Sequence, residues 1–222
     1  MSAEALIIDG YVDEPACFGV PPYISPYIRT VAGVLHEHGY EPGYLTIDQL
    51  RRDPRALSAI PGDAVVVMIA GVTVPGKYLG GTPATLTEIR QIGSQIRAKT
   101  RLIGGPIGFG YAPQGGRHAL KSAISGFDHL LTGSPAAALE SYLRGRDPSG
   151  TLDYLLIDRW SVAGAAIIRK HPSYPHLMCE MDTARGCSRA LTGGCSFCTE
   201  PFYGTPAYRA VEGVGAEVKA LH

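Results

Sequence analysis

The sequence has no surplus charge of either sign and no apolar run long enough to cross a membrane. Its 222 residues include 20 lysines and arginines against 20 aspartates and glutamates, so the formal net charge is zero. Without a block of one sign, bulk electrostatic attraction to nucleic acid or to an anionic membrane is not indicated. The most apolar run, residues 64–72, is about half of the roughly 20 residues that span a bilayer. We therefore expect no membrane association, and recognition through a local site.

Other absences narrow the class of protein further. The opening MSAEALIIDG lacks the basic segment and the cleavable apolar stretch of a secretory signal, which favours a cytoplasmic location. No internal repeat or low-complexity tract is visible, so solenoids and disordered linkers are not indicated. The composition, 45% hydrophobic and 18% charged with 28 glycines and 17 prolines, is typical of a soluble globular protein with many tight turns.

Cysteine is scarce, yet three of the five cysteines fall within one short segment, ARGCSRALTGGCSFCTEPFYG. An odd number of cysteines, three of them crowded together, fits metal ligation in a reducing compartment better than a disulfide framework. Cys187, Cys195 and Cys198 on one loop can hold three irons of a four-iron four-sulfur (4Fe-4S) cluster and leave the fourth iron open to a ligand. Such an open iron indicates a site that performs chemistry.

Zinc is the alternative for these thiols, because Cys-x-x-Cys is common in zinc ribbons. Zinc needs a fourth ligand and usually a second paired knuckle, which the sequence lacks; Cys179, His171 or His176 would have to be recruited. We expect Cys179 to be a buried small hydrophobe instead, and Cys17 to be an uninvolved loop thiol. The glycine-rich segment 77–81 lacks the Gly-Lys-Ser/Thr order of a phosphate-binding loop, so it either contacts a ligand or crosses from strand to helix.

Strand-like and helix-like segments alternate over the first 145 residues or so, with turn residues between them. Strands are expected at 5–9, 44–47, 64–70, 101–103 and 128–131 and helices at 27–38, 48–60, 83–98, 116–125 and 135–143. Five such β-α units predict an α/β fold with a five-stranded, doubly wound parallel sheet of flavodoxin- or Rossmann-like type over residues 1–146. The strand at 64–70 is apolar on both faces and is expected to be covered on both.

The pattern changes after the polar, turn-prone GRDPSG, which we interpret as a domain boundary. A connector is expected over residues 147–176, with strands at 154–157 and 165–169 and no helix around Pro172 and Pro175. A strand at 177–181, the cysteine loop and a helix at 208–221 follow, so the last unit spans 177–222.

This succession of strand, cysteine loop and helix resembles the opening unit of the radical SAM partial TIM barrel. The combination of DGYVDEPACFGVPPY, IAGVTVPGKYLGGTP and RGCSRALTGGCSFCTEPFYG resembles one group of that superfamily, whose members continue into a full barrel and a helix-hairpin-helix. The resemblance implies that Cys187, Cys195 and Cys198 bind the 4Fe-4S cluster, that S-adenosyl-L-methionine chelates its open iron, and that Phe197 contacts the adenine. The first spacer has seven residues where the family has three, and Gly193 and Gly194 let the longer loop fold back.

The first domain resembles the cobalamin-binding-like domains that precede many radical SAM barrels. Gly104, Gly105 and Gly133 stand where those domains have their signature glycines, and the resemblance therefore implies that these residues contact a cofactor. Residues 10–22 contain no histidine, so a cobalamin would bind without a protein imidazole on cobalt. The alternative is a domain that kept the fold and lost the cofactor, and the fold alone does not decide between the two.

The function implied by the resemblance is that of a radical SAM oxidoreductase, which takes an electron from a donor and cleaves S-adenosylmethionine reductively to a 5′-deoxyadenosyl radical. Residues 177–222 supply only the start of the barrel, so we expect this chain to be an inactive fragment with an exposed apolar edge. The missing C-terminal part would admit a nucleic-acid substrate. Two other classes stay open: a non-enzymatic Rossmann-like binding module with a zinc- or cluster-stapled tail, and an electron-transfer iron-sulfur protein.

Near the cysteines, four other side chains are expected to influence the cluster. Arg185 and Arg189 flank Cys187, where positive charge stabilises thiolates or a carboxylate, although both are also ordinary loop charges. Glu200 and Tyr203 come just after Cys198 and are expected to contact the groups that hold the metal.

Overall fold

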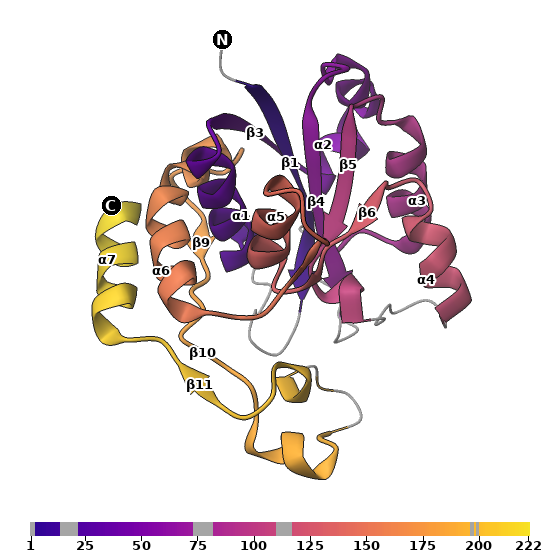
Figure 1. The fold of residues 1–222 in the computed structure, drawn as a ribbon. Coiled ribbons are helices and arrows are strands. Elements are labelled where there is room, and N and C mark those ends of the chain that lie inside the picture. Colours follow the sequence, from indigo (N-terminus) through magenta and orange to yellow (C-terminus); the bar gives the residue numbers. More distant parts are fainter. Residues whose placement is uncertain (1–2, 14–21, 73–81, 110–116, 196–197, 199) are drawn as a thin grey trace.

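The centre of the molecule is a parallel sheet of five strands with helices on both faces (Figure 1). The computed structural model describes residues 3–13, 22–72, 82–109, 117–195, 198 and 200–222. The strands are β1 (Ala3–Asp13), β3 (Tyr40–Thr46), β4 (Val65–Val72), β5 (Thr100–Gly104) and β6 (His129–Leu130). Their order across the sheet, β3-β1-β4-β5-β6, is the flavodoxin-like arrangement and confirms the predicted fold class.

Strand β4 shows why this sheet needs cover on both faces. Every residue from Val66 to Ala70 is 0% exposed. Val67 and Ile69 pack into the core beneath α1 (Pro26–Glu37) and α5 (Pro135–Leu143), while Val66 and Met68 pack into the core on the other side. Because successive side chains of a strand point to opposite faces, one apolar run contributes to two cores.

The second face carries α2 (Ile47–Arg52), α3 (Leu86–Gln95) and α4 (Arg117–Ile124), as Figure 1 shows. Both α2 and α3 begin with a capping box, in which Thr46 pairs with Gln49 and Thr85 with Glu88. Each box satisfies amide groups that the first helical turn leaves free.

The helix expected over residues 48–60 is wrong as a single element, because α2 ends at Arg52 and a 3-10 helix, η1 (Pro54–Ala59), follows. The residue before a proline is pushed out of the helical region, and Asp53 lies outside it with φ −139° and ψ 88°. The Asp53 carboxylate then caps η1 by accepting from the Arg55 amide. Strand β3, expected at residues 44–47, starts earlier, at Tyr40, and ends at Thr46, so that Ile47 belongs to α2.

The two strands expected in the connector are wrong: residues 154–163 form α6 (Tyr154–Ala163) and a 3-10 helix, η3 (Ala165–Lys170), follows. The buried side chains of α6 include Ile157 and Trp160, spaced three apart as on one helix face, and they join the core under α1. Asp153 caps the helix by accepting from the Leu155 amide. The apolar run at 154–157 is therefore one side of a helix.

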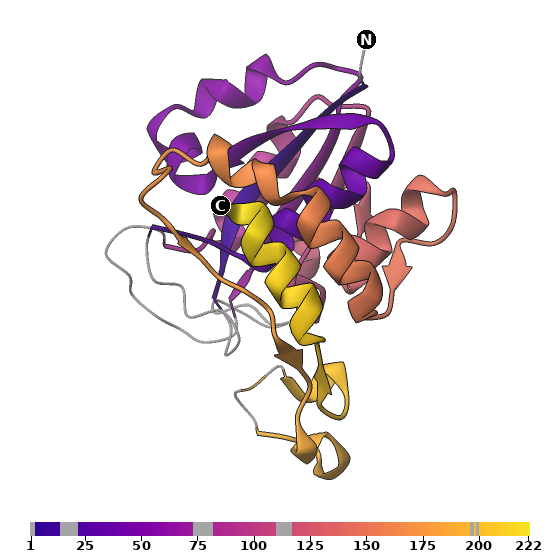
Figure 2. The same ribbon diagram turned by 90° about the vertical axis from the view of Figure 1, so that its left-hand side faces the viewer.

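Helix α7 (Val211–Leu221) adds an outer layer, packed against α6 and η3 (Figure 2). Before it, β9 (Met178–Cys179) pairs in parallel with β2 (Tyr23–Ile24), and β10 (Ala184–Arg185) pairs antiparallel with β11 (Ala207–Tyr208). The predicted succession of strand, cysteine loop and helix is therefore present, although the helix starts at Val211 because the preceding residues form β11.

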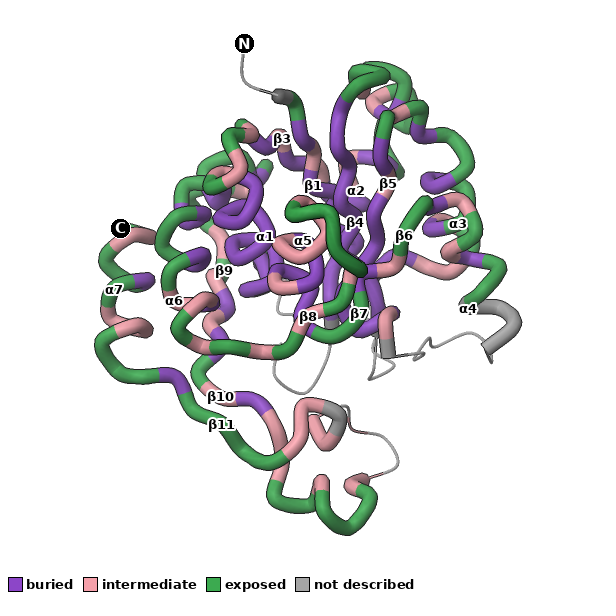
Figure 3. Tube along the Cα trace, in the orientation of Figure 1, coloured by how far each residue is buried: buried purple, intermediate pink, exposed green. Residues whose placement is uncertain are grey.

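The cysteine loop forms a lobe that projects from the body of the molecule, on the side to which the carboxyl ends of the sheet strands point (Figures 1 and 2). The lobe contains the 3-10 helices η4 (Ser188–Thr192) and η5 (Glu200–Tyr203). Buried residues concentrate in the sheet and in α1, whereas most described residues of the lobe are half-buried or exposed (Figure 3).

Three short elements complete the described fold: η2 (Pro106–Phe109), β7 (Thr132–Gly133) and β8 (Ser149–Gly150), the last two paired in parallel. None of the helices in the described part of the chain is both long and apolar enough to cross a membrane.

Candidate metal centre

Cys187, Cys195 and Cys198 all lie in the lobe between β10 and β11, and each is half-buried. Cys187 immediately precedes η4, and its amide donates to the Gly204 carbonyl at 2.9 Å. Cys195 and Cys198 share one turn, closed by the Cys198 amide donating to the Cys195 carbonyl at 3.1 Å. The structure therefore places the three predicted ligands on one closed loop.

Arg189 contacts two of the three thiols. Its backbone amide donates to the Sγ of Cys187 at 3.4 Å, and its Nη1 donates to the Sγ of Cys195 at 3.3 Å. The guanidinium therefore places a positive charge beside the Cys195 sulfur. Arg189 is thus the flanking arginine whose predicted contact with the cysteines the structure supports.

Two glycines let the chain turn back within this loop. A Cβ on Gly186, at φ +92°, would lie 2.5 Å from the Thr205 carbonyl oxygen. A Cβ on Gly194, at φ +73°, would lie 2.3 Å from the ring of Pro201. Only glycine fits such contacts at a left-handed φ, so the longer spacer between Cys187 and Cys195 is folded against the segment that follows Cys198.

The donor set differs from that of a single-ion site. Within the described residues, no three histidine, cysteine, aspartate or glutamate side chains converge closely enough to hold one metal ion. A single zinc ion requires that convergence. In a 4Fe-4S cluster each cysteine binds a different iron, so its sulfur ligands stand farther apart. Three thiols are the donor type that such a cluster takes, but the described residues show no assembled ligand group, so the role of these cysteines as ligands stays a prediction.

Arg185, one residue before Gly186, is a buried side chain at the base of the lobe, with ionic and aromatic contacts around it. Its guanidinium donates to Asp182 at 2.9 Å and to Glu200 at 3.1 Å, and its side chain is 2% exposed. The rings of Tyr27 and Tyr203 lie against it, with centroids 5.3 Å and 4.8 Å from the guanidinium carbon. Such cation–π contacts stabilise the buried guanidinium.

A second buried ion network joins the lobe's exit to the helical layers. Glu217 on α7 accepts from Arg29 of α1 and from Arg209, both at 2.7 Å, and both Arg29 and Glu217 are 0% exposed. Arg209 also donates to Asp158 of α6 at 2.7 Å. Since buried ions need close partners, these contacts fix α7 and the end of the lobe onto α1 and α6. This network is not recognisable from the sequence, because its members are far apart in the chain.

The other metal-ligand candidates have structural environments of their own. Cys179 is half-buried beside the core under α1, and burial raises the pKa of its thiol, as expected for a small hydrophobe. His171 is buried, burial lowers its pKa, and its ring lies 5.8 Å from that of Tyr44. His176 donates its backbone amide to the Ser173 carbonyl in a turn.

The three glycines predicted to contact a cofactor are tightly packed by protein atoms. A Cβ on Gly104 would lie 2.9 Å from the Cβ of Leu131, and one on Gly105, at φ +99°, 2.8 Å from the Ala70 carbonyl oxygen. A Cβ on Gly133, at φ +77°, would lie 2.1 Å from the Gly150 carbonyl oxygen. Packing alone explains glycine at these positions, and cofactor contact there stays a prediction. Phe197, Cys17 and the segment 77–81 lie outside the described residues.

Asp9 in β1 is a buried carboxyl group that the sequence analysis did not single out. It is 1% exposed and accepts from the Tyr44 hydroxyl at 2.7 Å and from the Tyr11 amide at 2.9 Å. Burial raises the pKa of Asp9 to about 6, against the lowering effect of both hydrogen bonds. The register between β1 and β4 shifts just after this residue, and Tyr11 adopts φ +56°. In the sequence, the carboxylate directly after the apolar run Leu6–Ile8 was the signal that could have indicated a buried acidic group.

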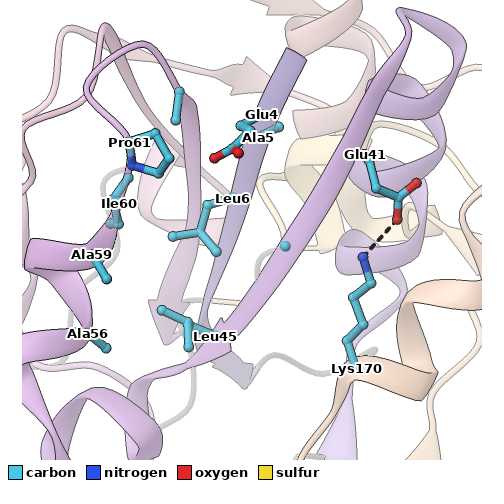
Figure 4. A pocket seen from close by; sticks show the side chains of 12 residues that line it. Glu4, Ala5, Leu6, Glu41, Leu45, Ala56, Ala59, Ile60, Pro61 and Lys170 are labelled. Carbon is cyan, nitrogen blue, oxygen red and sulfur yellow. Dashed lines mark hydrogen bonds and ion pairs between the residues drawn. The ribbon is translucent and has the colours of Figure 1, made fainter. Parts of the chain in front are cut away.

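A groove of about 550 Å³ opens at the other end of the sheet (Figure 4). Glu4, Leu6 and Leu45 line its floor, and Lys170 donates to Glu41 at its rim at 2.8 Å. Parallel α/β sheets bind ligands outside the carboxyl ends of their strands, and this groove lies near the amino end of β1. The lobe side is therefore the better site.

Comparisons with known proteins support the fold and leave the chemistry open. The chain is 37% identical to an uncharacterised protein, MJ0274, of Methanocaldococcus jannaschii over 235 aligned positions, and 38% identical to an uncharacterised protein of Archaeoglobus fulgidus over 219. The alignments cover 100% and 99% of this chain but 42% and 38% of the relatives, so the chain spans less than half of their length. No family model matches.

Among solved structures, the chain is similar to the radical S-adenosylmethionine methyltransferase TsrM of Kitasatospora setae, a structure with tryptophan substrate and a SAM analog bound. The TM-score is 0.58 at 19% identity, and the match covers 99% of this chain and 45% of that one. At this identity the likeness shows a shared fold.

Proposed function

We propose that this chain is the N-terminal portion of a radical SAM enzyme, with S-adenosyl-L-methionine as its small-molecule partner. The observation that carries the proposal is the closed loop with three half-buried thiols, set between β10 and β11 and before α7. The fold shared with a radical SAM methyltransferase over 99% of the chain supports it.

The residues of this chain would bind the cluster and orient S-adenosylmethionine. Cys187, Cys195 and Cys198 would hold a 4Fe-4S cluster, Arg189 would donate hydrogen bonds to the sulfurs of Cys187 and Cys195, and Phe197 would contact the adenine. When bound, the cluster would supply the electron, received from an external donor, for reductive cleavage of S-adenosylmethionine. The chain's own task is to place these groups and keep water from them.

The sheet domain would serve as a cofactor platform. We propose the division 1–146, 147–176 and 177–222, with Gly104, Gly105 and Gly133 beside a cobalamin that has no histidine ligand. The middle segment shares the core of the first, since Ile157 and Trp160 pack beneath α1. The remainder of the longer protein would recognise the substrate, including any nucleic acid.

Anaerobic reconstitution tests the proposal. We expect a brown protein with about four irons and four sulfides per chain, whose spectrum changes when S-adenosylmethionine is added. Cys195→Ala and Cys198→Ala should lose the iron, whereas the control Cys179→Ala, outside the loop, should keep it. Cleavage of S-adenosylmethionine is expected only from the extended gene product, assayed beside this chain. A colourless protein that binds zinc would overturn the proposal.

A further inference from the structure

The seven-residue spacer between Cys187 and Cys195 raises the question of what fixes the first thiol relative to the last two. A short spacer would set that distance by its own length. Here the path from Cys187 to Cys195 runs through η4 and two left-handed glycines, and η4 has no buried residue. Within the spacer, Arg189 contacts the sulfurs of Cys187 and Cys195, and a second constraint comes from the other arc of the loop, the one that runs past Cys198 to β11.

Glu200 closes that other arc. One of its carboxylate oxygens accepts from the Gly186 amide at 2.8 Å, and the other accepts from the Arg185 Nη1 at 3.1 Å. Glu200 thus comes two residues after the third cysteine and binds the residue just before the first. Its side chain is 15% exposed, so water competes weakly for these hydrogen bonds.

Arg185 connects this closure to the sheet domain. The guanidinium is held by Asp182 and Glu200 and lies over the rings of Tyr27 and Tyr203. The two tyrosine hydroxyls are 2.7 Å apart. Tyr27 belongs to the first turn of α1, while Tyr203 ends η5, so the contact joins positions 176 residues apart.

From this geometry we infer that Glu200 and Arg185 are positioning residues for the cysteine loop, anchored to α1 through the Tyr27–Tyr203 pair. The inference rests on the proposed function, because it assigns these side chains to the thiols that would hold the cluster. Groups that orient metal ligands typically change metal affinity or activity by about 10- to 100-fold when mutated.

Glu200→Gln is the direct test, because glutamine keeps the size of the side chain but offers one oxygen to two donors. In the anaerobically reconstituted chain we expect about ten-fold faster iron loss to a chelator, and an altered electron paramagnetic resonance line shape of the reduced cluster, with wild-type circular dichroism. The matched control is Asp128→Asn, which removes the 2.6 Å Arg101–Asp128 ion pair near the amino ends of β5 and β6. It should leave both cluster measurements unchanged.

The outcomes separate the two proposals. If the wild-type chain takes up no cluster, the proposed function fails and this inference falls with it. If the wild type takes up a cluster and Glu200→Gln matches it in iron retention and line shape, the inference alone is overturned. Should circular dichroism show that Glu200→Gln lowers the folded fraction, Arg185→Lys replaces it: lysine keeps the charge but lacks the planar fork that reaches both carboxylates, and the same changes are expected or the inference fails.

Discussion

Asp9 is a carboxyl group enclosed within the sheet, where the Tyr44 hydroxyl and the Tyr11 amide only partly replace the water it has lost. The charged form suffers most from that loss, which is why the pKa rises from 3.8 to about 6. The folded protein therefore holds a proton between pH 4 and 6 that the unfolded chain releases. By linkage, the Asp9 contribution to stability is largest below pH 4 and is lost as the pH rises through 6.

Asp9→Asn should remove this pH dependence. A shift from 3.8 to about 6 corresponds to roughly 3 kcal/mol, so the wild-type free energy of unfolding should fall by up to that amount relative to the variant between pH 4 and 7. Urea denaturation at a series of pH values measures it. Burial lowers the pKa of His171, which gives the opposite slope, but it does so in both proteins and cancels in the difference. A wild-type-to-variant difference that stays constant with pH would contradict the prediction.

At the scale of single residues, the sequence shows local motifs but not the contacts between side chains that are distant in the chain. The thiols of Cys187, Cys195 and Cys198 are recognisable because their meaning lies in local spacing. Arg185, by contrast, reads as an ordinary charge beside Cys187. Its burial depends on Tyr27, more than 150 positions earlier in the chain, and no local pattern announces such a contact.

Helices α1 and α6 touch backbone to backbone. A Cβ on Gly33 would lie 2.0 Å from the Trp160 carbonyl oxygen, and one on Gly164, just after α6, 2.0 Å from the Arg29 carbonyl oxygen. The close approach lets Trp160 reach the core with 1% exposure. The same approach sets where α7 lies, because α7 packs on α6.

Gly33→Ala should destabilise the chain by about 2 to 3 kcal/mol, because the new methyl group meets main-chain atoms that cannot rotate away. Gly215→Ala is the matched control, in the interior of α7 with nothing within 4 Å of its Cβ. There alanine should be neutral or stabilise by about 0.5 to 1 kcal/mol through helix propensity. Chemical denaturation of both variants compares them, and equal effects would show that the α1–α6 contact is looser than the structure indicates.

Elements were predictable where the period of the apolar pattern was clear. Strand β4 and helix α5 lie where the sequence indicates them. Strand β4 is apolar throughout, and α5 begins at Pro135 and ends with the apolar residue Leu143. Helix α6 was mistaken for a strand, because the run Tyr154–Ile157 is apolar at every position and shows no period of its own. The buried face of α6 is recognisable only from the packing of Ile157 and Trp160 beneath α1.

For the molecule as a whole, the outer helical layer leaves large apolar side chains in solvent. Leu155 and Val162 on α6 are 80% and 39% exposed, and Val211 and Val218 on α7 are 82% and 50% exposed. Within each helix the two residues are seven positions apart, hence on one side. Together these side chains form an exposed apolar surface on the outer faces of two helices, whereas the exposed barrel edge expected in residues 177–222 stays a prediction.

We predict that the chain self-associates at rising concentration, and that Leu155→Glu combined with Val211→Glu suppresses this. Both positions lie in the first turn of a helix, where an acidic side chain is tolerated by the dipole. Light scattering after gel filtration over a concentration series measures the mass. Gln91→Glu with Gln95→Glu adds the same charge to exposed positions of α3 and should leave association intact. A wild-type chain that is monomeric at every concentration would refute the prediction.

The buried Arg29–Glu217 ion pair also orders events in time, because 188 positions separate its two members. A ribosome adding roughly 5 to 20 residues per second needs about 10 to 40 s to synthesise residue 217 after residue 29. Throughout that interval the guanidinium on α1 has no carboxylate to meet it and must stay hydrated. During synthesis the Arg29 side of α1 is therefore exposed to water, and the outer layer can pack only after α7 has left the ribosome.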